Sequence, residues 1–143
     1  RAGAPLDLLA GDALRLPFPD ASFDAATIAF GIRNIPLRVE AMAEMGRVRK
    51  PGGRLHVLEF TTPRRPAVRR IYTRYLRHLL PRLGGLVSGD ASSYQYLADT
   101  ILHFPPPDEF RREMVAAGLV APRSHSLTQG IAWVHVAEKP LTD

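Results

Sequence analysis

The sequence predicts an α/β protein with a parallel sheet that ends in an antiparallel hairpin. A strand-like run over Phe23–Phe30 is followed by a helical pattern over Pro36–Lys50 and a second strand-like run over Arg54–Phe60. This order requires a crossover connection, which pairs the two strands in parallel. Two later runs, Val120–Leu127 and Ile131–Ala137, are joined by only three residues, and so short a link indicates a hairpin.

The composition is that of an ordinary soluble domain. The chain has 143 residues, of which 45% are hydrophobic and 23% charged, so we expect a single domain over residues 1–143. It holds no apolar run long enough to span a bilayer, and its first residues do not form a signal peptide. Cysteine is absent, which excludes disulfides and suits a cytoplasmic protein. The chain opens without methionine, so we expect it to be the later part of a longer protein.

Two strands are predicted in the first part of the chain. Leu6–Ala10 is a short apolar run that ends at a Gly-Asp turn. Phe23–Phe30 is longer and apolar and is bounded by turn signals, which is typical of a buried strand. Ligands of open α/β sheets bind beyond the carboxyl ends of parallel strands. Arg33 and Asn34 should therefore lie at such a crevice.

The middle of the sheet is predicted from one helix and one strand. Pro36–Lys50 begins with a proline suited to a first turn and repeats apolar residues at helical spacing until Pro-Gly-Gly stops it. In the strand Arg54–Phe60, buried positions are expected at Leu55, Val57 and Phe60.

Pro66–Leu83 is the most regular amphipathic segment of the chain. Pro81 should kink or end this helix, and the glycine-rich stretch 84–90 indicates a loop. Two further helices are expected, one over Ala91–Leu102 and one that runs from an Asp108 cap to a Gly118 stop.

The net charge is +5, and the arginines cluster between Arg64 and Arg82. Such a patch can serve nucleic acid or an anionic membrane surface. A solvated helix face in an arginine-rich protein explains it equally well.

Common catalytic motifs are absent from the sequence. No GxGxxG follows a strand, and there is no Walker loop, HExxH or GxSxG. The five histidines are scattered at spacings that favour packing or surface positions over a metal site.

Several polar residues at predicted strand ends could still carry chemistry. Asp12 could accept a hydrogen bond from an adenine amine, with the Ala13 backbone nearby, or could simply stabilise a turn. Arg33 and Asn34 could orient and polarise a phenol or carbonyl, or form a structural entry into a helix. Glu59 could bind a polar substrate group or serve as a cap or ion-pair partner. Two tyrosines of the helix after the glycine-rich stretch, Tyr94 and Tyr96, could line an aromatic pocket or pack in the core.

Three blocks of sequence resemble the ubiquinone and menaquinone biosynthesis C-methyltransferases, which are class I S-adenosylmethionine-dependent enzymes. These blocks are GDALRLPFPDASFDAATIAFGIRN (Gly11–Asn34), RVRKPGGRLHVLEFT (Arg47–Thr61) and LPRLGGLVSGDASSYQYLADTI (Leu80–Ile101). The last block is similar to the family's substrate lid, and the resemblance extends from Leu8 to Lys139.

The resemblance implies a Rossmann-like class I methyltransferase fold, S-adenosylmethionine as methyl donor, and no metal. It assigns Arg33 and Asn34 to catalysis. It assigns cofactor binding to Asp12, Ala13, Ala29 and Phe30, and substrate binding to Glu59, Tyr94 and Tyr96. The sequence departs from the family at Arg49, which is usually aliphatic, at Thr61, which is usually serine, at Asp12, which is often asparagine, and at Ala29, which is serine in some members.

The family's Gly-rich loop, its ribose-binding acidic residue and its first two strands have no counterpart in residues 1–143. In the family's sheet these strands lie between Leu6–Ala10 and Phe23–Phe30. We therefore expect a gap in the sheet and weak binding of S-adenosylmethionine by these residues alone.

The implied reaction is C-methylation of a polyprenyl hydroquinone, demethylmenaquinol to menaquinol. We favour menaquinone because an arginine- and proline-rich composition suits a high-GC bacterium. The alternatives are the 2-polyprenyl-6-methoxy-1,4-benzoquinol methylase of ubiquinone biosynthesis and a truncated, non-catalytic paralogue that acts as a binding subunit. We expect peripheral contact with the inner membrane face through Pro66–Leu83 and no nucleic-acid partner, and we leave a homodimer open.

Overall fold

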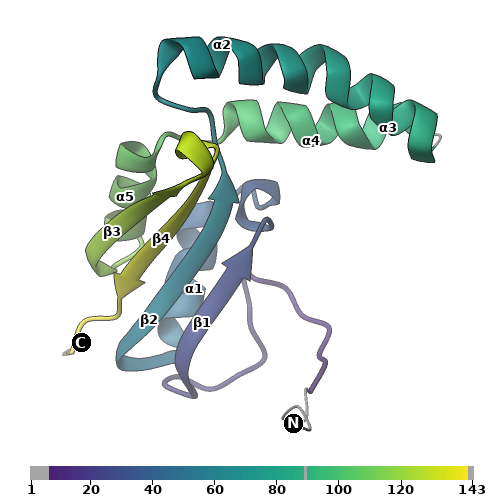
Figure 1. Ribbon diagram of the computed structural model, residues 1–143. Coiled ribbons are helices and arrows are strands. Elements are labelled where there is room, and N and C mark those ends of the chain that lie inside the picture. The colour runs from purple at the N-terminus through teal and green to yellow at the C-terminus, as the bar shows by residue number, and fades with distance from the viewer. Residues whose placement is uncertain (1–6, 89, 142–143) are drawn as a thin grey trace, which may run out of the picture.

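The computed structural model describes residues 7–88 and 90–141, and within them the chain forms one mixed sheet (Figure 1). The strand order is β1-β2-β4-β3. β1 is parallel to β2, whereas β4 is antiparallel to both β2 and β3. The predicted crossover and hairpin are thus confirmed. The strands are β1 (Phe23–Ala29), β2 (Arg49–Phe60), β3 (Val120–Leu127) and β4 (Ala132–Glu138).

Two helices cover one face of the sheet. α1 (Arg38–Arg47) is the crossover between β1 and β2, and α5 (Pro107–Ala116) precedes β3. Proline stands at the first turn of α5, where a missing N–H costs no helical hydrogen bond, so Pro106 rather than Asp108 is the cap residue. The core between these helices and the sheet contains Ile32, Met42, Met45, Leu55, Val57, Phe104, Phe110, Met114, Leu119 and Ala137.

A helical hairpin lies beyond the carboxyl ends of β1 and β2 (Figure 1). Its first arm is one continuous helix made of α2 (Pro66–Arg74), a π-helical turn η2 (Tyr75–Leu79) and α3 (Leu80–Ser88). Its second arm, α4 (Ala91–His103), folds back along the first, and Asp90 caps it by accepting from the backbone N–H of Ser92 and Ser93. Leu76, Ala98 and Ile101 are buried between the arms.

The prediction that Pro81 ends the first arm is wrong. The helix passes through Pro81 after the wider π turn, in which the Leu80 N–H bonds to the Tyr75 carbonyl. A π turn removes the normal i−4 pairing just before the proline. Gly84 is helical as well, rather than part of a loop, because the Tyr94 ring packs against it. A Cβ on Gly84 would lie 2.1 Å from Tyr94 Cδ2.

The two early strand predictions need correction. Within Leu6–Ala10, residues 7–10 are not a strand and Leu8 is 94% exposed, while Leu6 lies outside the described residues. No described strand lies beside this segment, and an unpaired strand is unstable in water. The run Phe23–Phe30 does form β1, but as a largely exposed edge strand rather than a buried one. Only β2 pairs with it in the described part of the chain.

The buried side chains of β2 differ from the prediction at the end of the strand. Leu55 and Val57 are buried as expected, but the next residue on their face is Glu59, which is 0% exposed. Because side chains alternate across a strand, Phe60 lies on the opposite face and is only partly buried. An apolar pattern alone assigned the wrong residue to the core, and the correction places a carboxylate there.

Arg49 is also fully buried. Its Nε donates to the Met45 carbonyl and its Nη1 to the Gly53 carbonyl, both at 2.9 Å. Burial lowers the pKa of Arg49 to about 10. The side chain thus ties the end of α1 to the turn inside β2 through backbone acceptors.

His135 should make the fold sensitive to acid. It is 1% exposed, its Nδ1 lies 2.8 Å from Ser124 Oγ, and its ring packs edge-on against Phe110. Burial, with a smaller effect of Arg111, lowers the pKa of His135 from 6.5 to about 4. Between pH 6.5 and 4, His135 therefore binds a proton in the unfolded chain but not in the folded chain. About 3 kcal/mol of stability should be lost as pH falls through this window.

The measurement is the urea unfolding free energy as a function of pH. His135→Gln, which can still accept from Ser124, should flatten the loss between pH 6.5 and 4. The matched control is His125→Gln, since His125 is exposed on the neighbouring strand. Equal slopes for His135→Gln and the unsubstituted chain would contradict this account.

Candidate active site at the ends of β1 and β2

A buried ion pair joins the ends of the two parallel strands. Arg33 follows β1 in a short 3₁₀ turn (Ile32–Asn34), and Glu59 is the penultimate residue of β2. Arg33 Nη1 lies 2.7 Å from Glu59 Oε1, and the two side chains are 10% and 0% exposed. The Phe60 N–H donates to the same oxygen at 2.9 Å, and the Arg33 N–H donates to Oε2 at 3.3 Å. The carboxylate is thus neutralised and hydrogen-bonded, as a buried charge requires.

This pairing fixes the guanidinium but does not use all of its donors. Nη1 also donates to the Phe30 carbonyl at 2.6 Å. Among the described residues, buried Nε of Arg33 has no hydrogen-bond acceptor. A buried polar atom left without a partner costs stability. The guanidinium is thus held in place at the strand ends, with its Nε buried.

Asn34 is held by a residue of the hairpin. Tyr96 Oη on α4 donates to Asn34 Oδ1 at 3.2 Å. Asn34 is exposed. The amide therefore keeps its two N–H donors on the open side of this contact.

A pocket of about 220 Å³ opens beside Arg33. It lies between the turn after β1 and one face of α4 and is lined by Arg33, Tyr96, Asp99, Thr100, His103 and Phe104. His103 Nδ1 lies 2.7 Å from the Asp99 carbonyl. A carbonyl only accepts, so Nδ1 carries a proton. The pocket thus combines the Arg33 guanidinium with an imidazole.

Aromatic rings enclose the other side of the cluster. Phe30, at the end of β1, stacks on Phe60 with centroids 4.5 Å apart. Tyr72 of α2 packs against the Leu76 cluster of the hairpin. Burial raises the pKa of Tyr72 to about 12; Tyr75 adds to the rise, and the positive charge of Arg33 partly opposes it. Tyr72 therefore stays a neutral phenol near the ion pair.

Most of the residues predicted for the site meet in this one place. Arg33, Asn34, Glu59, Phe30 and Tyr96 are brought together by the two strand ends and α4, as the distances above show. Tyr94 is not among them, because it faces α3 and packs on Gly84. Its predicted role in substrate binding stays a prediction.

Asp12 and Ala13 lie in a separate, exposed turn before β1. One oxygen of Asp12 accepts from the Leu14 N–H at 2.9 Å, which stabilises the turn. Ala13 packs against the main core. Ala29 is exposed at the end of the edge strand.

His103 and Tyr72 were missed by sequence reasoning. His103 carried a findable signal, since Tyr96, Asp99, Thr100 and His103 are spaced i, i+3, i+4 and i+7 and so share one face of a helix. Tyr72 carried none, because its place depends on how the hairpin docks.

Two negative findings concern the described residues alone. Residues 7–88 and 90–141 contain no group of three or more His, Asp or Glu side chains placed to hold a metal ion. In the same residues, no helix is long and apolar enough to cross a bilayer.

Comparison with known proteins decides the family. Residues 2–139 match the model of the ubiE/COQ5 methyltransferase family. The chain belongs to this family. Among its relatives, the demethylmenaquinone methyltransferase of Deinococcus radiodurans is 49% identical over 129 residues, which cover 90% of this chain and 53% of the relative. The Thermus thermophilus protein of the same name is 46% identical over 138 residues, or 96% of this chain and 62% of the relative.

This ubiE/COQ5 family chain thus spans about half the length of the curated relatives it matches. A solved S-adenosylmethionine-dependent methyltransferase from Thermotoga maritima superposes with a TM-score of 0.60 at 21% identity. It matches over 92% of this chain and 63% of its own. That likeness confirms the predicted methyltransferase fold, including its antiparallel end.

Proposed function

We propose that the protein transfers a methyl group from S-adenosylmethionine to a ring carbon of demethylmenaquinol. The single observation that carries the proposal is the buried Arg33–Glu59 pair at the strand ends, whose arginine lines a pocket. Family membership and the names of both relatives support it.

Carbon methylation of a hydroquinone needs electron density at the ring carbon. S-adenosylmethionine would supply an electrophilic methyl group and leave as S-adenosylhomocysteine, and the methylated ring carbon would lose its own proton to restore the aromatic ring. The Arg33 guanidinium and the Asn34 amide donate hydrogen bonds to the ring hydroxyl and stabilise the phenolate-like charge as it develops. His103 Nε2 accepts the hydroxyl proton. Because Glu59 and the Phe30 carbonyl hold the guanidinium in place, it needs no rearrangement during the reaction.

The chain's own residues fit one end of the methyl donor. The exposed Asp12 carboxylate and the Ala13 backbone are available to the adenine, and Ala29 and Phe30 offer an apolar edge next to the ion pair. The ribose and methionine ends find no acidic strand end or glycine-rich loop in residues 1–143. We therefore keep the expectation that these residues alone bind S-adenosylmethionine weakly.

Substrate choice is tested by direct competition. The catalytically active form of the protein receives labelled S-adenosylmethionine with demethylmenaquinol or with 2-polyprenyl-6-methoxy-1,4-benzoquinol. We expect kcat/KM to favour the naphthoquinol, since both relatives above are named for it. A preference for the benzoquinol would instead assign the protein to ubiquinone biosynthesis. No turnover in the presence of intact cofactor binding would favour the non-catalytic subunit instead.

The substrate's prenyl tail keeps it in the bilayer, so the enzyme must meet it there. We place the protein in the cytoplasm with peripheral contact to the inner membrane face through the helix that begins at Pro66. A homodimer is compatible with this arrangement.

A further inference from the structure

We propose that the outer face of the α2–η2–α3 helix is an interfacial docking surface for an anionic lipid bilayer. The proposal rests on the membrane contact proposed above and deepens it by naming the surface and the lipid chemistry. Two features of this helix carry it, a cationic groove and an apolar stripe.

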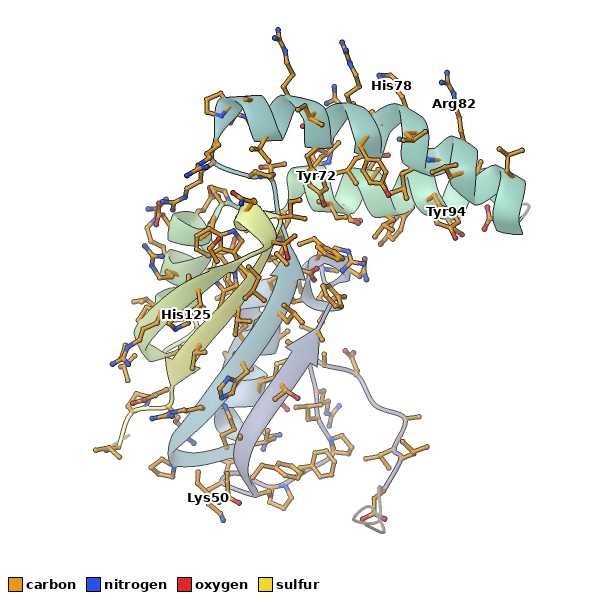
Figure 2. The ribbon with its side chains drawn as sticks, viewed as in Figure 1. Lys50, Tyr72, His78, Arg82, Tyr94 and His125 are labelled. Atoms are coloured by element: carbon orange, nitrogen blue, oxygen red, sulfur yellow. The ribbon has the colours of Figure 1, made fainter. Side chains whose placement is uncertain are left out.

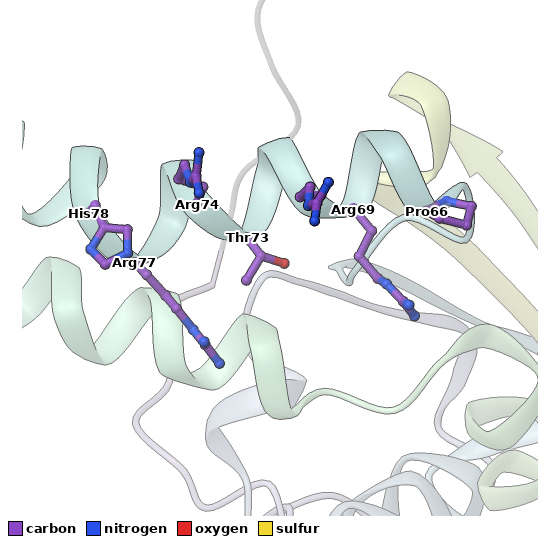
Figure 3. Close-up of a pocket in the computed structure, with 7 residues that line it drawn as sticks. Pro66, Arg69, Thr73, Arg74, Arg77 and His78 are labelled. Carbon is purple, nitrogen blue, oxygen red and sulfur yellow. The ribbon is translucent and has the colours of Figure 1, made fainter.

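The cationic groove runs along the first two thirds of the helix (Figure 3). It encloses about 460 Å³ and is lined by Pro66, Arg69, Arg70, Thr73, Arg74, Arg77 and His78. No aspartate or glutamate occurs in residues 66–88. In the described part of the chain, none of these arginines takes part in an ion pair, whereas Arg33, Arg38, Arg47, Arg54, Arg64 and Arg111 all do. The groove therefore presents uncompensated positive charge.

Figure 2 shows His78 and Arg82 on the side of the helix turned away from α4. The four arginines of the groove are exposed as well, so this positive charge is accessible. Phosphate groups are its natural complement, because arginine forks match phosphate oxygens.

An apolar stripe runs beside the groove. Ile71, Tyr75, Leu79, Leu83 and Leu86 follow one another at steps of four, four, four and three residues. Each is an exposed large hydrophobic residue, and the two ends of the stripe are the most exposed, at 72% for Ile71 and 84% for Leu86. Tyr75 also stacks on Tyr72, but each side chain of the stripe keeps at least 39% of its surface exposed.

The basic groove and the apolar stripe together favour a membrane over other anionic partners. A helix with a basic face and an exposed apolar face lies in the headgroup region, with its apolar side chains among the acyl chains. Nucleic acid or free phosphate would satisfy the arginines but would offer the leucines nothing. The hairpin lies beyond the same strand ends that carry the Arg33–Glu59 pair (Figure 1). Docking through this face therefore brings the candidate active site toward the bilayer that holds a prenylated quinol.

The test is co-sedimentation of the chain with vesicles, without cofactor or quinol. One set is phosphatidylcholine alone, and the other is phosphatidylcholine with phosphatidylglycerol in equal parts. We expect binding to the anionic set only, weakened by salt. Arg70→Glu with Arg74→Glu should weaken it about 25-fold or more, since each basic residue near such a surface contributes about fivefold. Ile71→Ser with Leu86→Ser should also weaken binding but should leave the salt dependence of binding unchanged.

The matched control is Arg112→Glu with Arg123→Glu, which changes the net charge equally at exposed positions of α5 and β3. We expect it to bind like the unsubstituted chain. Equal losses in both arginine pairs, or equal binding to both vesicle sets, would overturn the proposal. Full displacement of the chain from the vesicles by soluble glycerophosphoglycerol would also overturn the proposal. Binding of an oligonucleotide in preference to vesicles would overturn it as well. The same holds for a dimer that Ile71→Ser with Leu86→Ser dissociates.

The outcome of this test does not depend on whether the proposed reaction is correct. In the catalytically active form, Arg70→Glu with Arg74→Glu should leave turnover of a short-chain, water-soluble quinol unchanged. Lost vesicle binding with unchanged soluble turnover is the signature of a docking surface.

Discussion

Replacing Glu59 by alanine should destabilise the fold by about 3 to 5 kcal/mol, because it leaves the Arg33 charge buried without a partner. The Phe60 and Arg33 N–H groups lose their acceptor in the same step. The unfolding free energy from urea titration, followed by circular dichroism, measures the effect. Glu59→Gln should cost less, since an amide oxygen can still accept from these backbone groups.

The control for this prediction is an ion pair on the surface. Arg54 and Glu138 are paired at 3.2 Å with side chains 62% and 36% exposed. Exposed pairs contribute at most about 1 kcal/mol. Glu138→Gln should therefore be nearly neutral. If Glu59→Ala cost no more than Glu138→Gln, the cluster would not have the structural role described here.

Replacing Arg33 by alanine should lower kcat about 100- to 1,000-fold, the usual cost of losing one donor to a developing oxyanion. The affinity for S-adenosylmethionine should hardly change, because Arg33 lines the pocket proposed for the acceptor, together with Tyr96 and His103. Single-turnover methyl transfer and calorimetric titration of the donor separate the two effects in the catalytically active form of the protein.

Arg33→Ala also leaves the Glu59 carboxylate uncompensated, so folding must be checked alongside. Arg33→Lys keeps the positive charge and loses the forked guanidinium. It should fold close to normally yet remain slow, since a single ammonium group cannot pair with Glu59 and also replace the forked guanidinium toward a ligand. Arg54→Ala, on the exposed part of β2, should keep full kcat. Normal turnover by folded Arg33→Ala would remove Arg33 from the reaction.

Sequence reasoning could predict the elements that depend on local signals. The parallel pair, the hairpin and the helix over Ala91–Leu102 follow from apolar periodicity and turn residues. Arg33 and Asn34 were found because they follow a strand directly. Their contacts with Glu59 and Tyr96 link residues 26 and 62 positions apart, and no local pattern encodes such pairs.

The errors share a physical cause, which is that burial depends on neighbours. β1 is apolar enough for a sheet interior, yet it lies at an edge because no described strand pairs with its other side. Phe60 was predicted to be buried, but strand alternation places Glu59 rather than Phe60 on the core face of β2. Tyr94 and Tyr96 are two residues apart on one helix, so they point to different sides of it. Tyr96 lines the pocket, whereas the Tyr94 ring packs on Gly84.

We propose that this chain carries the acceptor side of a carbon methyltransferase. The most direct test supplies the catalytically active protein with ¹³C-methyl S-adenosylmethionine and demethylmenaquinol and locates the label by NMR. We expect the label in a methyl group bonded to a ring carbon, and no label in the Arg33→Ala product at equal time. A methoxy signal, or label at the ring carbon formed equally fast without Arg33, would contradict the account.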